Sequence, residues 1–265
     1  MPQDLSLAER FLPLLQDRHL HDVTHADDLV IAEEGKLRVL YAPFDHVNRQ
    51  ARVVIVGITP GLNQAEEAIS VAIKARDGGA GQDGILARAK ATASFSRGVM
   101  RTNMLRLLEG VGLPAALSLP SAASIFDVAN QDVHLTSSLR YPVFKKNGRG
   151  EYENYNGPNP LRSPILRGMI ESHLAEEARM LPDALWIPLG DVAGRGVEHL
   201  VQNGLLDERQ VLSGMPHPSG ANNGPIGTFL GGTPPQNMSA ESAERLRMRR
   251  ASVVEKIRAF ATPAA

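Results

Sequence analysis

The chain contains no cysteine among its 265 residues. This absence excludes disulfides, a cysteine nucleophile, zinc bound by cysteine and any cysteine-held iron–sulfur cluster. The sequence also lacks an apolar run of the roughly 18–20 residues that a membrane-spanning helix needs. Its first residues include acidic side chains and no basic segment before an apolar run, which is unlike a secretory signal peptide. We therefore expect a cytoplasmic protein that does not bind a membrane.

The sequence has little excess charge of either sign, because its formal net charge is −1. Proteins that bind nucleic acid tightly and without sequence preference are usually basic overall. Any contact of this chain with nucleic acid must therefore use a local basic patch. The candidates for such a patch are Arg97, Arg101 and Arg106, and Arg140, Lys145, Lys146 and Arg149. The alternative for each of these residues is an ordinary solvated surface charge.

The distribution of apolar residues predicts a largely parallel α/β sheet. Four short runs are typical of strands buried on both faces, namely Arg52–Val56, Asp132–Ser137, Ala184–Gly190 and Gln210–Gly214. Helical patterns lie between these runs, and strands that alternate with helices favour parallel pairing. In such sheets the ligand binds outside the carboxyl ends of the strands.

We expect one domain over residues 1–265, because no internal repeat and no convincing linker divides the chain. Residues 1–50 are expected to form an N-terminal helix and hairpin arm, with a turn at Glu34–Lys36. Residues 237–265 are expected to form a C-terminal helix, with acidic side chains early and basic ones late. Residues 145–159 and 216–236 are rich in Gly, Asn and Pro and are expected to be loops.

A glycine- and proline-rich turn follows the first predicted strand. It consists of Gly57, Ile58, Thr59, Pro60 and Gly61. Its backbone can approach a ligand closely. It matches neither a Walker loop nor a dinucleotide fingerprint. The alternative is an ordinary strand-to-helix turn.

A histidine between two prolines follows the last predicted strand. The prolines restrict the backbone around His217, and an imidazole can donate a hydrogen bond or carry a proton near neutral pH. Ser219, Asn222 and Asn223 come next and can donate to phosphate oxygens. The alternative is a structural loop histidine.

Two further segments combine polar or aromatic residues with a predicted strand or helix end. Polar residues in 133–144 emerge at the carboxyl edge of the sheet, although Thr136 or Ser137 could instead cap a helix. Phe95, in a turn before a predicted helix, is a candidate either for core packing or for stacking on a planar ligand.

Taken in order, these segments resemble the uracil-DNA glycosylase superfamily. GITPG at 57–61 resembles its first motif, and HPS at 217–219 resembles its second. Between them, ASFSRGVMRTNMLRLLEGVGL, VHLTSSLRYPVF and SPILRGMIESHLAEEARMLPDALWIPLGDVAGRGV resemble segments of the iron–sulfur-type members. The resemblance runs from about Arg52 to Ser219. It identifies a divergent relative without the cysteines of the iron–sulfur cluster.

This resemblance implies a three-layer α/β/α sandwich with a four-stranded, mainly parallel central sheet. It also implies a monofunctional glycosidase of base-excision DNA repair, which hydrolyses the N-glycosidic bond of uracil flipped out of DNA. The implied partner is DNA containing uracil. We expect a monomer that uses neither a metal ion nor a cofactor.

The resemblance implies roles for individual residues. His217 matches the catalytic donor to uracil O2, and Thr59 stands where related enzymes carry the acid or amide that positions the attacking water. The implied base contacts are Gly57, Ile58, Pro60, Gly61, Phe95 and Ser137. The implied DNA contacts are Ser219, Gly220, Asn222, Arg97 and Lys145. Phe229 or Leu230 could wedge into the base stack.

Two departures from the family pattern leave alternatives open. Thr59 is a poor base, and Ser137 stands in place of a base-reading asparagine that makes two contacts. One alternative is the same chemistry on another deaminated base, such as hypoxanthine or xanthine. Another is a catalytically inactive DNA-binding homologue. No GxSxG elbow supports a serine hydrolase.

Overall fold

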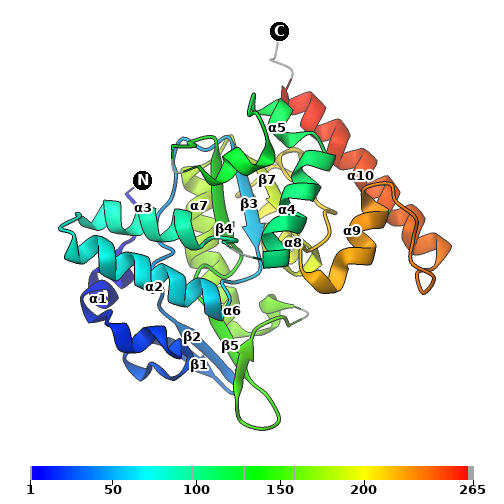
Figure 1. Ribbon diagram of the computed structural model, residues 1–265. Coiled ribbons are helices and arrows are strands. Elements are labelled where there is room, and N and C mark those ends of the chain that lie inside the picture. Colours follow the sequence, from blue (N-terminus) through cyan, green and yellow to red (C-terminus); the bar gives the residue numbers. More distant parts are fainter. Residues whose placement is uncertain (1, 97, 128, 158, 262–265) are drawn as a thin grey trace.

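The computed structural model describes residues 2–96, 98–127, 129–157 and 159–261 and is built around a three-stranded parallel sheet (Figure 1). The strand order is β4 (Val133–Ser137), β3 (Val53–Gly57) and β7 (Leu185–Pro188). Every residue of β3 is buried, as expected for a central strand covered on both faces. The predicted mixed α/β fold with a parallel sheet is confirmed.

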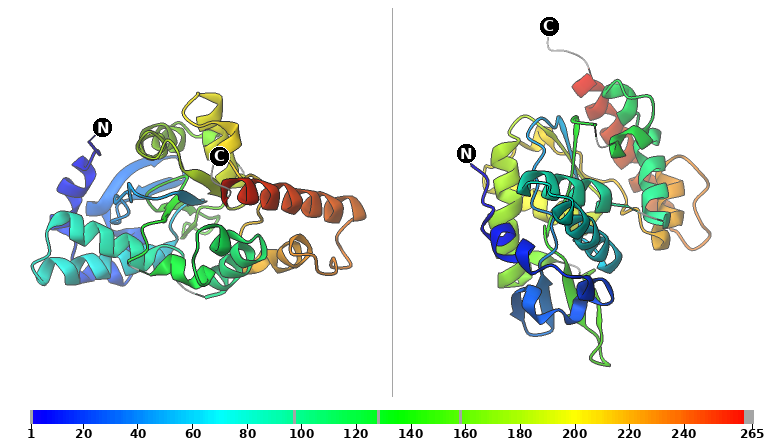
Figure 2. Two further views of the ribbon diagram at one scale, coloured as in Figure 1. Left: turned by 90° about the horizontal axis from the view of Figure 1, so that it is seen from above. Right: turned by 60° about the vertical axis from the view of Figure 1, so that its left-hand side comes forward.

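Helices cover both faces of this sheet, because alternate side chains of β3 enter two different cores. Val54 and Val56 belong to one core, and Val53 and Ile55 belong to the other. The first core is covered by α2 (Leu62–Asp77), α3 (Gln82–Ala93), α6 (Pro164–Met169), α7 (Ala175–Met180) and α8 (Asp191–Gln202). The second is covered by α4 (Gly98–Gly110), α5 (Leu113–Ala116), α9 (Asn223–Phe229) and α10 (Ala240–Ala261). Figure 2 shows α10, the predicted C-terminal helix, alongside α9.

The fourth predicted strand does not form a continuous strand. In the segment 210–214 and just beyond it, Val211 and Met215 make isolated parallel bridges to Trp186 and Leu189. A short 3₁₀ turn ends at Gln210, and Gly214 has a φ of +109°, so extended backbone is interrupted on both sides. The central sheet therefore has three strands with a bridged segment beside β7.

A second, antiparallel sheet packs near the first and has the order β1-β2-β5-β6. The predicted N-terminal hairpin is confirmed as β1 (Val30–Glu34) and β2 (Leu37–Leu40), after the short helix α1 (Ser6–Phe11). The expectation of a loop over 216–236 was wrong in part, because α9 lies within it. The expectation of a loop over 145–159 was also wrong in part. The chain forms β5 (Val143–Lys146) and β6 (Tyr152–Asn154), because β5 pairs with β2.

The described part of the chain contains no helix that is both long enough and apolar enough to cross a membrane.

Candidate functional site

A cavity of about 410 Å³ opens where β3 and β4 end. This is the edge at which parallel α/β sheets bind their ligands. The cavity is lined by every residue predicted to act in catalysis or to contact the base, namely Gly57, Ile58, Thr59, Pro60, Gly61, Phe95, Ser137 and His217. The structure therefore brings together segments that are up to 160 residues apart in the sequence, from 57 to 217.

The Phe95 ring lies directly against the turn after β3. A Cβ atom on Gly57 would lie 3.0 Å from Cζ of this ring and 3.3 Å from the Ser137 hydroxyl, so the close approach depends on glycine. Phe95 has a φ of +50°, which few non-glycine residues adopt. The ring is buried in the second core, as expected for core packing, and it also forms part of the cavity wall.

The Thr59 hydroxyl connects the turn after β3 to the start of β5. It donates to the Tyr141 carbonyl at 3.0 Å and accepts from the Val143 backbone N–H at 3.1 Å. These two bonds fix its orientation and leave one lone pair on Oγ1 that can accept from water. Thr59 is thus a structural link as well as a residue of the cavity wall.

His217 lies against the turn after β7, and this contact requires Gly190. A Cβ atom on Gly190 would lie 2.7 Å from the His217 Cβ, and Gly190 has a φ of +86°. Among the described residues, none makes a hydrogen bond to the His217 ring. Burial lowers its pKa, so the imidazole is neutral at neutral pH and has one N–H to donate.

The loop that carries His217 is held by amide side chains. The Asn222 amide donates to the His217 carbonyl at 3.0 Å and to the Ser219 hydroxyl at 3.2 Å. The Asn103 amide on α4 donates to the Pro218 carbonyl at 3.2 Å. Sequence reasoning missed Asn103 and Gly190. Only the position of Gly190 at the end of a predicted strand gave any signal.

Residues of the antiparallel sheet form part of the cavity mouth. The Asn154 carboxamide oxygen, at the end of β6, accepts from the Leu62 backbone N–H at the start of α2 at 2.9 Å. A Cβ on Gly61 would lie 3.3 Å from the Asn154 amide nitrogen. The exposed residues Asn63, Asn154 and Asn156 line the cavity here.

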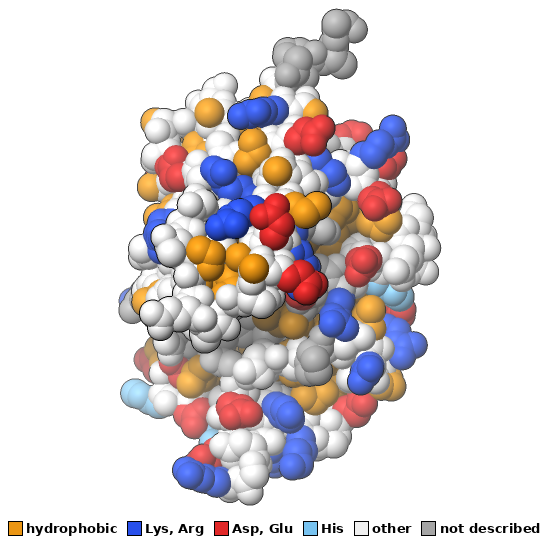
Figure 3. Space-filling model, turned by 90° about the vertical axis from the view of Figure 1, so that its right-hand side faces the viewer, with side chains coloured by type: hydrophobic (Ala, Val, Ile, Leu, Met, Phe, Trp, Pro, Cys, Tyr) orange, Lys and Arg blue, Asp and Glu red, His pale blue; other side chains and the backbone are white. Residues whose placement is uncertain are grey.

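The residues predicted to contact DNA do not form one basic surface. Ser219 and Gly220 lie in the His217 loop, whereas Lys145 is exposed on β5 and does not line the cavity. Arg97 lies outside the described residues. Figure 3 shows basic and acidic side chains interspersed over one face of the molecule, without a large area of one sign.

Two sequence predictions are corrected by burial. Arg140, proposed for a surface patch, is 2% exposed, because two glutamates and a backbone carbonyl bind its guanidinium. Phe229 is fully buried, and Leu230 packs on Gly110, so neither side chain is free to enter a base stack.

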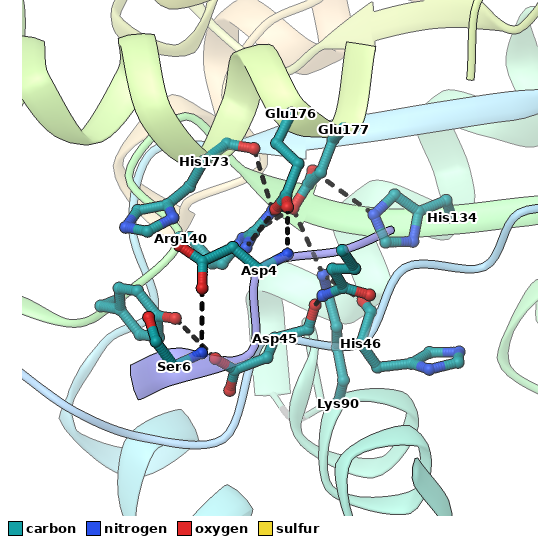
Figure 4. Close-up of polar contacts among 12 residues, drawn as sticks. Asp4, Ser6, Asp45, His46, Lys90, His134, Arg140, His173, Glu176 and Glu177 are labelled. Carbon is teal, nitrogen blue, oxygen red and sulfur yellow. Dashed lines mark hydrogen bonds and ion pairs between the residues drawn. The ribbon is translucent and has the colours of Figure 1, made fainter. Parts of the chain in front are cut away.

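A buried ionic cluster lies behind the cavity and joins α3, β4 and α7 (Figure 4). Arg140 Nε donates to Glu177 Oε1 at 2.9 Å. Lys90 Nζ donates to the His46 carbonyl at 2.8 Å and lies 3.7 Å from Glu177 Oε1. His134 Nε2 lies 3.4 Å from Glu177 Oε2. Lys90 and Arg140 also line the cavity, so the cluster reaches the candidate site.

The cluster sets the charges of its members. Burial lowers the pKa of Lys90 to about 8, although Glu177 opposes the shift, so the amine is mostly protonated at pH 7. Burial opposes ionisation of Glu177, but Lys90 and Arg140 outweigh it and hold the pKa of that carboxyl well below its usual range. Burial and Lys90 together lower the pKa of His134 to about 4, so this imidazole is neutral.

No family model matches the chain. The chain is 36% identical over 200 residues to the uncharacterized protein YoxB of Bacillus subtilis strain 168, and this match covers 74% of the chain and 76% of that protein. No solved structure matches the chain. In the described part of the chain, no group of three or more His, Asp or Glu side chains is arranged to hold a metal ion.

Proposed function

This chain belongs to the same family as YoxB of Bacillus subtilis, and we propose that it is a DNA glycosylase that hydrolyses the N-glycosidic bond of uracil flipped out of DNA. The observation that carries the proposal is the convergence of three separate segments on one cavity. Thr59 follows β3, Phe95 precedes α4, and His217 follows the bridged segment beside β7, yet all three line it. The parallel sheet with helices on both faces is consistent with a uracil-DNA glycosylase-like arrangement.

In the proposed reaction the bond between C1′ of deoxyribose and the base nitrogen breaks. The electron pair leaves with the base, and water adds to C1′ and gives up a proton. Negative charge therefore grows on the base in the transition state. A fixed donor aimed at such charge contributes strongly to catalysis, often about 10²–10³ in rate. His217, neutral and without a hydrogen bond to its ring in the described part, is the donor we assign to the base carbonyl.

The remaining wall positions the base. Phe95 is the aromatic side chain we assign to stacking on the base, and Gly57 leaves the room that this ring needs. The turn at 57–61 and Ser137 complete the wall around the base edge. In such a transition state the bond to the base is largely broken before water attacks, so the water needs little activation. The lone pair left on Thr59 Oγ1 is enough to orient it.

The test is excision from labelled oligonucleotides that contain one uracil, single-stranded and paired, followed by alkaline cleavage of abasic sites. We expect strand cleavage with the native protein and a loss of about 10²–10³ in rate for His217→Ala. His21→Ala, at an exposed position, is the matched control and should retain full activity. Native protein that leaves every uracil substrate intact, or that binds uracil DNA without turnover, refutes the proposal.

A second candidate is the same chemistry on a deaminated purine such as hypoxanthine or xanthine. The cavity volume of about 410 Å³ supports this candidate. Pockets for drug-sized ligands start at about 300 Å³, so the cavity can hold a purine as well as a pyrimidine. A panel of oligonucleotides with uracil, hypoxanthine or xanthine at one position separates the two candidates by their relative excision rates.

A further inference from the structure

The cavity has a mouth and a deep end that differ in chemistry. Its mouth carries the exposed amides of Asn63, Asn154 and Asn156. Its deep end is formed by side chains that are at most 4% exposed, namely Phe44, Lys90, Thr136 and Arg140. A ligand that fills this cavity would therefore meet two cations and one hydroxyl at the deep end.

The two cations differ in their free hydrogen-bonding capacity. The Arg140 guanidinium is bound by Glu176, Glu177 and the His173 carbonyl, which accept from all three of its nitrogens. The Lys90 ammonium has three N–H groups. Among the described residues it donates to the His46 carbonyl at 2.8 Å and forms an ion pair with Glu177 Oε1 at 3.7 Å, which leaves one N–H for a ligand. A lysine ammonium only donates. Lys90 can thus serve a further acceptor but cannot accept from a donor.

Thr136 provides a second, independent observation. Its Oγ1 is buried and has no hydrogen-bond partner in the described part of the structure. Thr136 follows His134 by two residues on β4, so both side chains lie on the face of the sheet that carries the ionic cluster. Buried polar atoms are normally paired, and an unpaired hydroxyl in a cavity wall points to a polar ligand.

On the basis of the proposed function, we propose that Lys90 and Thr136 read the far edge of the flipped base. Lys90 donates to a carbonyl oxygen, and the Thr136 hydroxyl accepts from the adjacent ring N–H. This pattern of a carbonyl beside a ring N–H occurs at O4 and N3 of uracil and at O6 and N1 of hypoxanthine. Cytosine and adenine place an amino group where the carbonyl would be, and this group meets a donor. These two contacts therefore distinguish uracil from cytosine and hypoxanthine from adenine, whereas thymine and guanine present the same carbonyl beside a ring N–H.

The decisive variant is Lys90→Gln, because a glutamine amide both donates and accepts. Excision rates on uracil and on cytosine in otherwise identical oligonucleotides are measured for the native protein and the variant. We expect the native protein to excise uracil and not cytosine, and the variant to lower this preference at least tenfold. Lys74→Gln, at an exposed position on α2, is the control and should leave the preference unchanged.

Thr136→Val keeps the shape of the side chain and removes the hydroxyl, so it tests the second contact separately. We expect it to lower uracil excision severalfold without a gain on cytosine, with circular dichroism establishing that each variant is folded. If Lys90→Gln does not fold, Thr136→Val decides alone. A folded variant with native preference and native rate overturns the assignment of its residue. Native protein without excision of any deaminated base overturns the proposed function instead.

Discussion

Replacing Glu177 by glutamine is expected to lower the free energy of unfolding by about 3–5 kcal/mol, because the change breaks a buried ion pair from one side. The side chain is 1% exposed. Its carboxylate accepts from Arg140 at 2.9 Å and lies 3.7 Å from Lys90. Glutamine keeps the shape and one acceptor oxygen, but it leaves two buried cations short of a counter-charge.

Urea unfolding at neutral pH measures this difference, and Glu176→Gln is the matched control. Glu176 accepts from the same Arg140 guanidinium at 3.1 Å, but its side chain is 15% exposed. Partial solvation of Glu176 lowers the cost of losing its charge, so the control should cost clearly less than Glu177→Gln. Comparable losses of unfolding free energy in the two variants would show that burial does not explain the contribution of Glu177 to stability.

The same comparison has a defined dependence on pH. Arg140 and Lys90 hold the pKa of folded Glu177 below its ordinary value of 4.5. The stability that this carboxylate contributes is therefore fully present above pH 4.5 and is lost as the pH falls toward the pKa of the folded state. The gap between the native protein and Glu177→Gln should be constant near neutral pH and shrink on acidification. A gap that grows on acidification would refute the reasoning.

Three further predictions concern the cavity. Gly190→Ala should reduce excision roughly tenfold or more by displacing His217, since the new Cβ would lie 2.7 Å from the His217 Cβ. Gly194→Ala, in open space on α8, should retain native kcat/KM. Thr59→Val should lower stability in urea by about 1–3 kcal/mol by unpairing buried backbone groups, whereas Thr59→Ser should not. The preference for uracil over cytosine should fall above pH about 8, because Lys90 then loses a proton and its amine can accept a hydrogen bond. Excision rates on both substrates from pH 7 to pH 9 test this, and an unchanged preference contradicts it.

The parts of the site that follow strands could be predicted from the sequence. Gly57–Gly61 and His217 each come directly after an apolar run, and parallel strands deliver such residues to one edge of a sheet. Phe95 was harder to predict, because an aromatic residue before a helix most often packs in the core. Its position depends on the room beside Gly57, which only the fold reveals.

The errors come from pairing between distant residues. The local sequence around Arg140 is typical of a surface cation. In the fold, Glu176 and Glu177, 36 and 37 positions later, bind and neutralise its buried guanidinium. Residues 145–159 look like a loop because they are rich in Gly, Asn and Pro, but β5 gains its partner from β2, about 100 residues earlier, and β6 then pairs with β5. No local sequence pattern predicts either pairing.

The register of the β5–β6 hairpin determines which side chain lies at the mouth of the cavity. Asn154 pairs with Phe144, and Tyr152 pairs with Lys146. Neighbouring residues of a strand face opposite sides, so a single inserted residue between 152 and 154 would turn the Asn154 carboxamide away from α2. Residues 147–151 lie beyond the paired positions, where the chain tolerates changes of length. The mouth of the cavity could therefore be re-engineered by replacing residues 147–151 with loops of other lengths, provided that the spacing within β5 and β6 is preserved.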